Sequence, residues 1–270
     1  MRRSILTLTV AATVGLLVTG CGSSSTTDGS SSTLSQLSSS GSGSASVSGT
    51  VNVFAAASLK AAFTSLGQRF ELAHPGLKVV FNFGPSSGLA TQITQGAPAD
   101  VFASASTKNM GELVAAGQAV SPKKFASNVM EVVVPAKNPA RVRALSDLAK
   151  PGVKVALCQV AVPCGAAAAK VFANAKLTVT PVTQEVDVKA VLAKVILGEV
   201  DAGVVYVTDV RAAGTKVKGI RIPTYLNAST KYPIATLTTA PNRAAAQAFM
   251  YYVLSAEGAG VLLADGFAKP

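Results

Sequence analysis

VNVFAAASLKAAFTSLGQRF (residues 51–70) and KVVFNFGPSSGLATQITQG (residues 78–96) are two successive units of the same design. In each, a short apolar run predicts a buried strand and ends at serines that open a helical pattern, at Ser58 and at Ser86-Ser87. A single serine at such a junction is most simply a helix N-cap. Helix starts also direct backbone N–H groups and the positive end of the helix dipole at an anion. Two such junctions among small residues therefore indicate half of an oxyanion site, because small residues let the backbone approach a ligand closely.

Downstream of this stretch, apolar patterns alternate between strand and helix. We expect strands at 129–135, 153–157, 202–207, 219–223 and 232–237, and helices at 110–113, 166–173, 188–196, 244–254 and 258–263. The chain of 270 residues is 49% hydrophobic, enough to bury the core of one large or two modest domains. Alternating strands and helices predict an α/β fold with mainly parallel sheets.

The first 49 residues have a different composition. Arg2 and Arg3 precede an apolar run at 5–18 that is short for a membrane span, which predicts a signal peptide over 1–20. The run ends in Val-Thr-Gly-Cys at 18–21, which resembles the lipobox of bacterial lipoproteins and implies cleavage before Cys21 and acylation of its thiol. An ordinary signal peptide with an incidental cysteine is the alternative. Serine makes up 14 of the 28 residues at 22–49, so we expect no core there but a flexible, lipid-anchored tether over 21–49 spanning about 30 Å.

Cys158 and Cys164 remain once Cys21 is acylated. Outside the cytoplasm, an isolated pair this close is most simply a disulfide. A redox C-x-x-C motif does not fit the spacing, and His74 is the single histidine of the chain, which disfavours zinc.

Gly84-Pro85-Ser86-Ser87-Gly88 satisfies G-x-S-x-G, the nucleophile elbow of α/β-hydrolases. That class needs an acid and then a histidine after the serine, whereas His74 precedes it, in an expected surface turn. Without a base the serine stays unactivated, so a Ser-dependent hydrolase is the weaker hypothesis and we predict no enzyme. Asp100 and Asp201 each stand at the start of an expected strand, where capping of local backbone is the simpler interpretation.

The chain carries 24 basic and 13 acidic residues, and loss of Arg2 and Arg3 would leave a charge of about +9. The basic residues are scattered, with neither a recognition motif nor an aromatic platform, so we expect no nucleic-acid partner. A basic surface raises the local concentration of small anions.

Four segments together carry a family resemblance: VFAAASL (53–59), FGPSSGLATQI (83–93), GAPADVFASA (96–105) and DAGVVY (201–206). In this order they resemble the periplasmic molybdate-binding proteins of ABC importers. The resemblance implies a type II periplasmic binding fold with two α/β lobes, joined by crossing strands near 129–135 and 232–237. It places the first lobe at 50–130 with 234–270 and the second at 131–233.

The resemblance also implies the ligand-binding residues. The oxyanion would be held, without a countercharge, by hydroxyls and amides carried over to Ser58, Ser86, Cys164, Val188 and Tyr206. Ala105 is a weaker candidate. Two departures bear on fine selectivity: Cys164 stands where a small residue is expected, and Pro85 removes one donor from the Ser86 loop.

The implied function is capture of molybdate or tungstate by lobe closure and delivery to a membrane permease with its cytoplasmic ATPase. We expect a monomer on the outer face of the cell membrane, anchored through its lipid, with neither a cofactor nor a metal cation bound directly. Another tetrahedral oxyanion, chiefly sulfate, is the alternative ligand. A lipoprotein that senses the anion without transport is the alternative role.

Overall fold

The computed structural model describes residues 47–270. The expected signal peptide, the acylation site Cys21 and nearly all of the tether lie outside the described residues. Strand β1 begins at Gly49, one residue before the expected start of structure at Thr50. Within residues 47–270, no helix is both long and apolar enough to cross a membrane.

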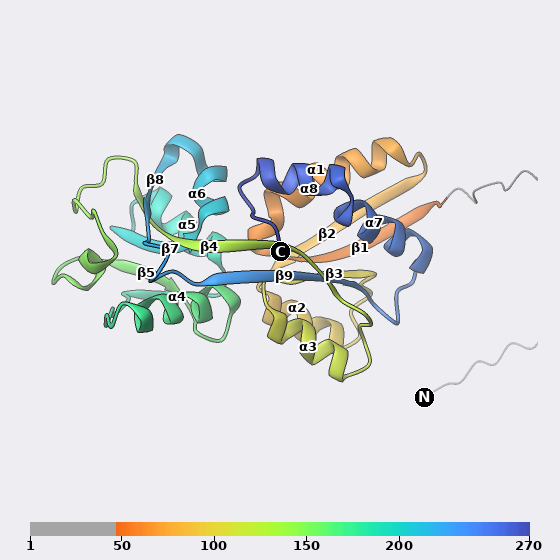
Figure 1. Ribbon diagram of the computed structural model, residues 1–270, viewed down its shortest axis with the longest axis horizontal. Coiled ribbons are helices and arrows are strands. Elements are labelled where there is room, and N and C mark those ends of the chain that lie inside the picture. Colours follow the sequence, from red (N-terminus) through yellow and green to blue (C-terminus); the bar gives the residue numbers. More distant parts are fainter. Residues whose placement is uncertain (1–46) are drawn as a thin grey trace, which may run out of the picture. The chain divides into compact units, whose positions relative to one another are not determined.

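The first lobe is the half of the protein that carries the two strand–serine–helix units (Figure 1). Its strands are β1 (Gly49–Ala56), β2 (Leu77–Gly84) and β3 (Val101–Ala103), and its helices are α1 (Lys60–Ala73), α2 (Ser86–Thr94), α3 (Thr107–Ala115), α7 (Arg243–Leu254) and α8 (Ala256–Ala264). Residues of α1, α7 and α8 pack in one core with Val51 and Val53, whereas α2 and α3 pack on Phe54 and Phe102. Both faces of the sheet are thus covered, which explains why its strands read as continuous apolar runs.

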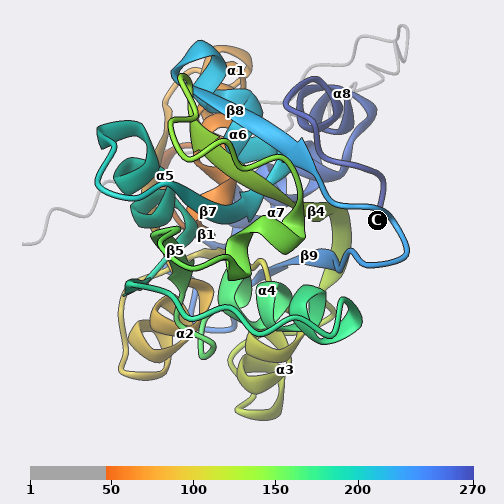
Figure 2. The same cartoon turned by 90° about the vertical axis from the view of Figure 1, so that its left-hand side faces the viewer.

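The second lobe has its own core, built from residues between 130 and 228. It contains β5 (Val155–Cys158), β6 (Thr183–Glu185), β7 (Ala202–Tyr206), β8 (Val217–Arg221), α4 (Pro163–Asn174), α5 (Val188–Leu197), α6 (Val207–Ala213) and the 3-10 turns Leu145–Ala149 and Gly214–Lys216. Helix α4 lies on the opposite side of the strands from α5 and α6 (Figure 2).

Two strands join the lobes: β4 (Lys123–Pro135) and β9 (Ser229–Thr236). Residues 123–129 of β4 pair with β9, and residues 130–135 pair with β7 and β8. Because β4 belongs to both halves, the strands form one continuous order, β2-β1-β3-β9-β4-β7-β5-β6, with β8 paired to β4. The predicted α/β fold with two lobes is therefore confirmed.

The expectation of mainly parallel sheets was only half right. Strand β1 is parallel to β2 and β3, and β5 is parallel to β6 and β7, but every pairing made by β4 or β9 is antiparallel. Strand β4 also begins six residues before the expected residue 129. Its first half was missed because it contains few apolar side chains. Helix α6 and the three-residue strand β6 were missed, since neither has a long enough apolar repeat.

Candidate functional site

A small cavity lies where the two lobes meet. Its volume is about 20 Å³, compared with about 320 and 290 Å³ for the two hollows described below. Its lining comes from Ala56, Ala57, Ser58, Gly84, Pro85, Ser86 and Ala105 of the first lobe and from Val162, Pro163, Cys164, Asp187, Val188 and Tyr206 of the second. All five residues expected to hold the oxyanion, and the weaker candidate Ala105, thus meet around one space.

The two serines of the first lobe are not helix caps, contrary to the simpler interpretation of their positions. Ser58 lies inside the 3-10 turn Ala57–Leu59 that precedes α1, and Ser86 is the first residue of α2; neither helix start has a side-chain cap. The Ser58 hydroxyl lies 2.9 Å from the Tyr232 hydroxyl, and Ser86 Oγ accepts a 2.9 Å bond from the Ala105 amide. Both serines are buried, at 5% and 1% exposed, and both line the cavity.

The Ala105 amide therefore has a partner already, Ser86 Oγ. Through this bond Ala105 orients the serine hydroxyl, whose proton is left to donate elsewhere.

The second lobe presents the start of α4. Pro163 occupies its first position, where a missing N–H costs nothing, and Val162 accepts the Ala166 amide. The amides of Cys164 and Gly165 are therefore the donors of this first turn that have no partner among residues 47–270. A Cβ on Gly165 would lie 1.9 Å from the Gln159 carbonyl oxygen, so only glycine fits this close approach.

A disulfide joins Cys158, the last residue of β5, to Cys164, and the predicted pairing is thereby found. It closes the loop that leads into α4. The bond fixes the position of the Cys164 amide relative to the sheet.

Helix α5 presents the Val188 amide. Asp187 is its N-cap, and Asp187 Oδ1 accepts bonds from the amides of Lys189 at 2.8 Å and Ala190 at 3.0 Å. The Asp187 carbonyl accepts the Val191 amide. Among the first four amides of the helix, Val188 N–H alone has no partner within the described residues, and Val188 lines the cavity.

Tyr206 ends β7 and is 1% exposed. Its hydroxyl is buried and forms no hydrogen bond with any residue of the described part, although Thr230 and Tyr232 lie beside it. Burial raises the pKa of this phenol well above its usual value, and the neighbouring hydroxyls offset only part of the shift. The Tyr206 hydroxyl can therefore donate a hydrogen bond to a ligand in the cavity.

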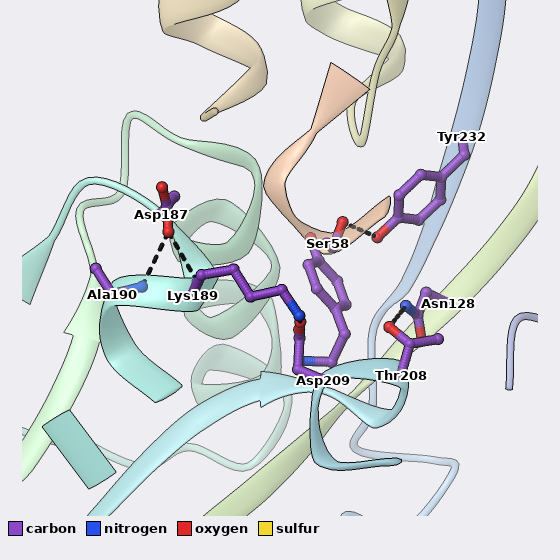
Figure 3. A network of polar contacts seen from close by, with 9 residues as sticks. Ser58, Asn128, Asp187, Lys189, Ala190, Thr208, Asp209 and Tyr232 are labelled. Atoms are coloured by element: carbon purple, nitrogen blue, oxygen red, sulfur yellow. Dashed lines mark hydrogen bonds and ion pairs between the residues drawn. The ribbon is translucent and has the colours of Figure 1, made fainter. Parts of the chain in front are cut away.

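Asp209 contacts both Lys189 of α5 and the backbone of Tyr206, and Figure 3 shows it beside Lys189. Its carboxylate is fully buried, accepts the Tyr206 amide at 3.1 Å, and lies 2.7 Å from Lys189 Nζ. Burial raises the pKa of Asp209, and the charge of Lys189 opposes the rise. The ion pair links the start of α5, which carries Val188, to the first turn of α6, which directly follows Tyr206. Sequence reasoning missed this pair because the two residues are 20 positions apart.

The electrostatics of the site favour an anion. Lining residues come from the starts of the 3-10 turn before α1 and of α2, α4 and α5. Their unpaired amides and positive dipole ends attract negative charge. Among the described lining residues only Asp187 is charged, and its Oδ1 is engaged by its own helix. The arrangement can therefore bind a small anion through uncharged donors.

The residues considered for catalysis are not assembled here. His74 ends α1, bonds to the Phe70 carbonyl through Nδ1 at 2.9 Å and is not among the residues that line the cavity with Ser86.

Asp100 and Asp201 bind backbone, but not the local backbone that was expected. Asp100 accepts the amides of Asn52 and Asn242, and Asp201 accepts the Lys154 amide. Both carboxylates therefore join segments far apart in the sequence.

Two α/β lobes, two crossing strands and a cavity between the lobes are the features of the class of periplasmic binding proteins. A family model described as bacterial extracellular solute-binding protein matches residues 51–268, and the chain belongs to this family. The resemblance found in the four sequence segments is confirmed by relatives of the expected kind.

The molybdate-binding protein ModA of Mycobacterium tuberculosis is 45% identical over 219 residues, which cover 81% of this chain and 84% of that protein. A putative ABC transporter substrate-binding lipoprotein, YvgL of Bacillus subtilis, is 31% identical over 81% of this chain and 86% of its own. Among solved structures, the periplasmic molybdate-binding protein of Azotobacter vinelandii aligns with a TM-score of 0.73 over 82% of this chain and 99% of that one, at 22% identity.

Proposed function

We propose that this protein captures molybdate outside the cytoplasm and delivers it to the permease of an ABC importer, whose ATPase is cytoplasmic. The observation that carries the proposal is the convergence of Ser58, Ser86, Cys164, Val188 and Tyr206 on one 20 Å³ cavity. The 45% identity to a molybdate-binding protein supports it. Solute binding without catalysis is the corresponding activity.

The chemistry of the donors favours a fully deprotonated tetrahedral anion. Oriented hydroxyls and amides stabilise a dianion without the cost of burying a cation beside it. Phosphate keeps a proton at neutral pH, and in a site of donors that proton lacks an acceptor, a loss of about 1–3 kcal/mol. Among the described residues that line the cavity, Asp187 alone is a carboxylate, and its cap bonds to Lys189 and Ala190 turn it toward its own helix.

Size decides among the remaining anions. Molybdate, tungstate and sulfate all lack a proton at neutral pH, so hydrogen bonding does not separate them. Molybdate and tungstate are nearly equal in size, and sulfate is smaller. We therefore propose similar, tight binding of the first two and much weaker binding of sulfate.

The wider arrangement follows from the same proposal. We propose that the lobes formed by 50–130 with 234–270 and by 131–233 close around the anion, and that the protein acts as a monomer. Acylation at Cys21 would hold it at the outer face of the membrane through the tether at 21–49, and this proposal is supported by the Bacillus relative, which is named as a putative lipoprotein. No cofactor takes part.

Titration calorimetry of the purified chain against molybdate, tungstate, sulfate and phosphate tests the ligand. Tight binding of the first two, with sulfate far weaker and phosphate without measurable heat, is the expected result. Phosphate or sulfate binding as tightly as molybdate would refute it. Growth of a deletion strain on trace molybdate distinguishes import from sensing, because only loss of import would slow growth.

A further inference from the structure

Two hollows at the seam between the lobes share a wall with the anion cavity. One, of about 320 Å³, shares Ser58 and contains Arg211 and Asp265, whose opposite charges balance. The other, of about 290 Å³, shares Ala105 and Pro163, and we call it the seam groove. Its lining is Ala105, Ser106, Thr107, Lys108, Pro163, Ala166, Ala167, Lys170, Ala228, Ser229, Thr230 and Lys231.

The seam groove carries three positive charges, and no acidic residue is among its described lining. Lys108 stands on α3 of the first lobe, Lys170 on α4 of the second, and Lys231 on the crossing strand β9. Lys108 makes only a long ion pair with Glu112, 3.9 Å apart and well exposed. An exposed pair of this kind neutralises little of the charge.

This charge distribution complements the cavity, whose described lining contains no basic residue. A cavity that binds through uncharged donors exerts little attraction on an anion in bulk solvent, whereas a cleft lined by one sign of charge focuses the field and raises association rates by about 10- to 1,000-fold. We propose that the seam groove is the entrance through which the oxyanion reaches the cavity, and that Lys108, Lys170 and Lys231 steer it there. The inference rests on the proposed function and adds the route and the residues that set the rate of capture.

The lysines should act on association and not on retention. They line the groove and not the cavity, so they attract the arriving anion but do not contact it once it is bound. Their replacement by neutral residues should slow association at low salt and leave dissociation unchanged. Screening should remove the difference, since the Debye length shrinks to about 3 Å at 1 M salt.

Stopped-flow kinetics with molybdate test this. Tyrosine fluorescence can report binding, because the chain has no Trp and Tyr206 lines the cavity. In the triple variant K108Q/K170Q/K231Q we expect the association rate constant to fall about 10-fold near 10 mM ionic strength and to match the native chain in 1 M salt. The matched control K78Q/K216Q/K218Q removes the same charge from exposed lysines outside both the groove and the cavity, and should change the rate less than twofold.

Equal slowing in both triple variants would show that net charge alone causes the effect, and it would overturn the proposal that the seam groove is the entrance. An unchanged association rate in the groove variant would also overturn it. Loss of import in that variant would then indicate that the seam groove contacts the transporter. A native chain that binds no oxyanion refutes the proposed function instead. A native chain that binds normally beside an equally fast groove variant refutes only the entrance.

Discussion

At the scale of single residues, the two serine hydroxyls of the site each have one partner. Ser86 Oγ accepts from the Ala105 amide, so its proton points elsewhere. Ser58 shares a hydrogen bond with Tyr232 of β9, which couples a ligand donor to a crossing strand. Such preorganisation lowers the cost of ordering the donors when the ligand arrives.

Ser58→Ala should weaken molybdate binding about 10- to 100-fold, because it removes one hydrogen bond to a charged ligand worth about 1.5–3 kcal/mol. Calorimetry measures the change. Ser87→Ala is the matched control, because Ser87 neighbours Ser86 but does not line the cavity. Native affinity in the Ser58 variant would show that its hydroxyl does not contact the ligand.

Tyr206→Phe should cost at least as much. Tyr206 is 1% exposed and its hydroxyl has no partner in the described part of the chain, so a bound ligand would supply the hydrogen bond that this hydroxyl lacks. Removing it relieves the empty protein of an unsatisfied group and deprives the complex of a bond, so affinity should fall while stability holds or rises. Calorimetry with denaturant unfolding separates the two effects, and Tyr225→Phe, at a residue 81% exposed, should alter neither.

At the scale of elements, the sequence allowed the helix starts to be placed but not the reason for their serines. Apolar periodicity located α1, α2 and α5 within a few residues. The roles of Ser58 and Ser86 depend on Tyr232 and Ala105, contacts that no local pattern encodes. The five site residues were found through the family resemblance, whereas the ion pair of Lys189 with Asp209 carries no sequence signal until α5 and α6 are brought side by side.

The disulfide ahead of α4 should matter for both stability and binding. Cys158→Ser with Cys164→Ser should lower the free energy of unfolding by about 2 kcal/mol, from loop closure in the chain-entropy model. Because the Cys164 amide lines the cavity, molybdate affinity should fall as well. Urea unfolding and calorimetry of the double variant measure these losses, and mild reductant on the native chain should reproduce them. Unchanged affinity would separate the loop from the site.

The buried Asp209 predicts a pH dependence of stability. Its pKa is raised in the folded state, so folding favours the protonated form. The stability this provides is complete below the unfolded pKa of about 3.9 and is lost as pH rises through the raised folded value. Asp209→Asn should remove that decline. The difference between native and variant unfolding free energies, measured from pH 3.5 upward, should therefore change steadily and then level off, and a flat difference would contradict the raised pKa.

At the scale of the whole molecule, the two cores are joined through β4 and β9 alone among the described strands. Solution scattering should show a smaller radius of gyration with saturating molybdate than without it. Binding confirmed by calorimetry with an unchanged profile would mean that the lobes do not move. Ser58→Ala at a concentration too low for it to bind provides the control for nonspecific ion effects.

The two-lobed architecture was within reach of the sequence, but the antiparallel joint was not. Residues 129–135 read as a strand because they are apolar, whereas 123–128 include two lysines, a serine and an asparagine. That first half of β4 is held by β9, more than 100 residues away, and by a bridge from Ser127 to Ala268. Long-range pairing outweighs local composition at this joint.

The chain segments that form each core determine the order in which the two lobes can be completed. The second lobe draws its core from one uninterrupted stretch of chain between 130 and 228, whereas the first needs residues from both 51–126 and 232–267. Synthesis proceeds from the N-terminus, so all residues of the second lobe's core are made before the last residues of the first lobe's core. The first lobe can therefore be completed only after β9, α7 and α8 have been synthesised. Tyr232 of β9 then forms its hydrogen bond with Ser58, a residue that lines the cavity.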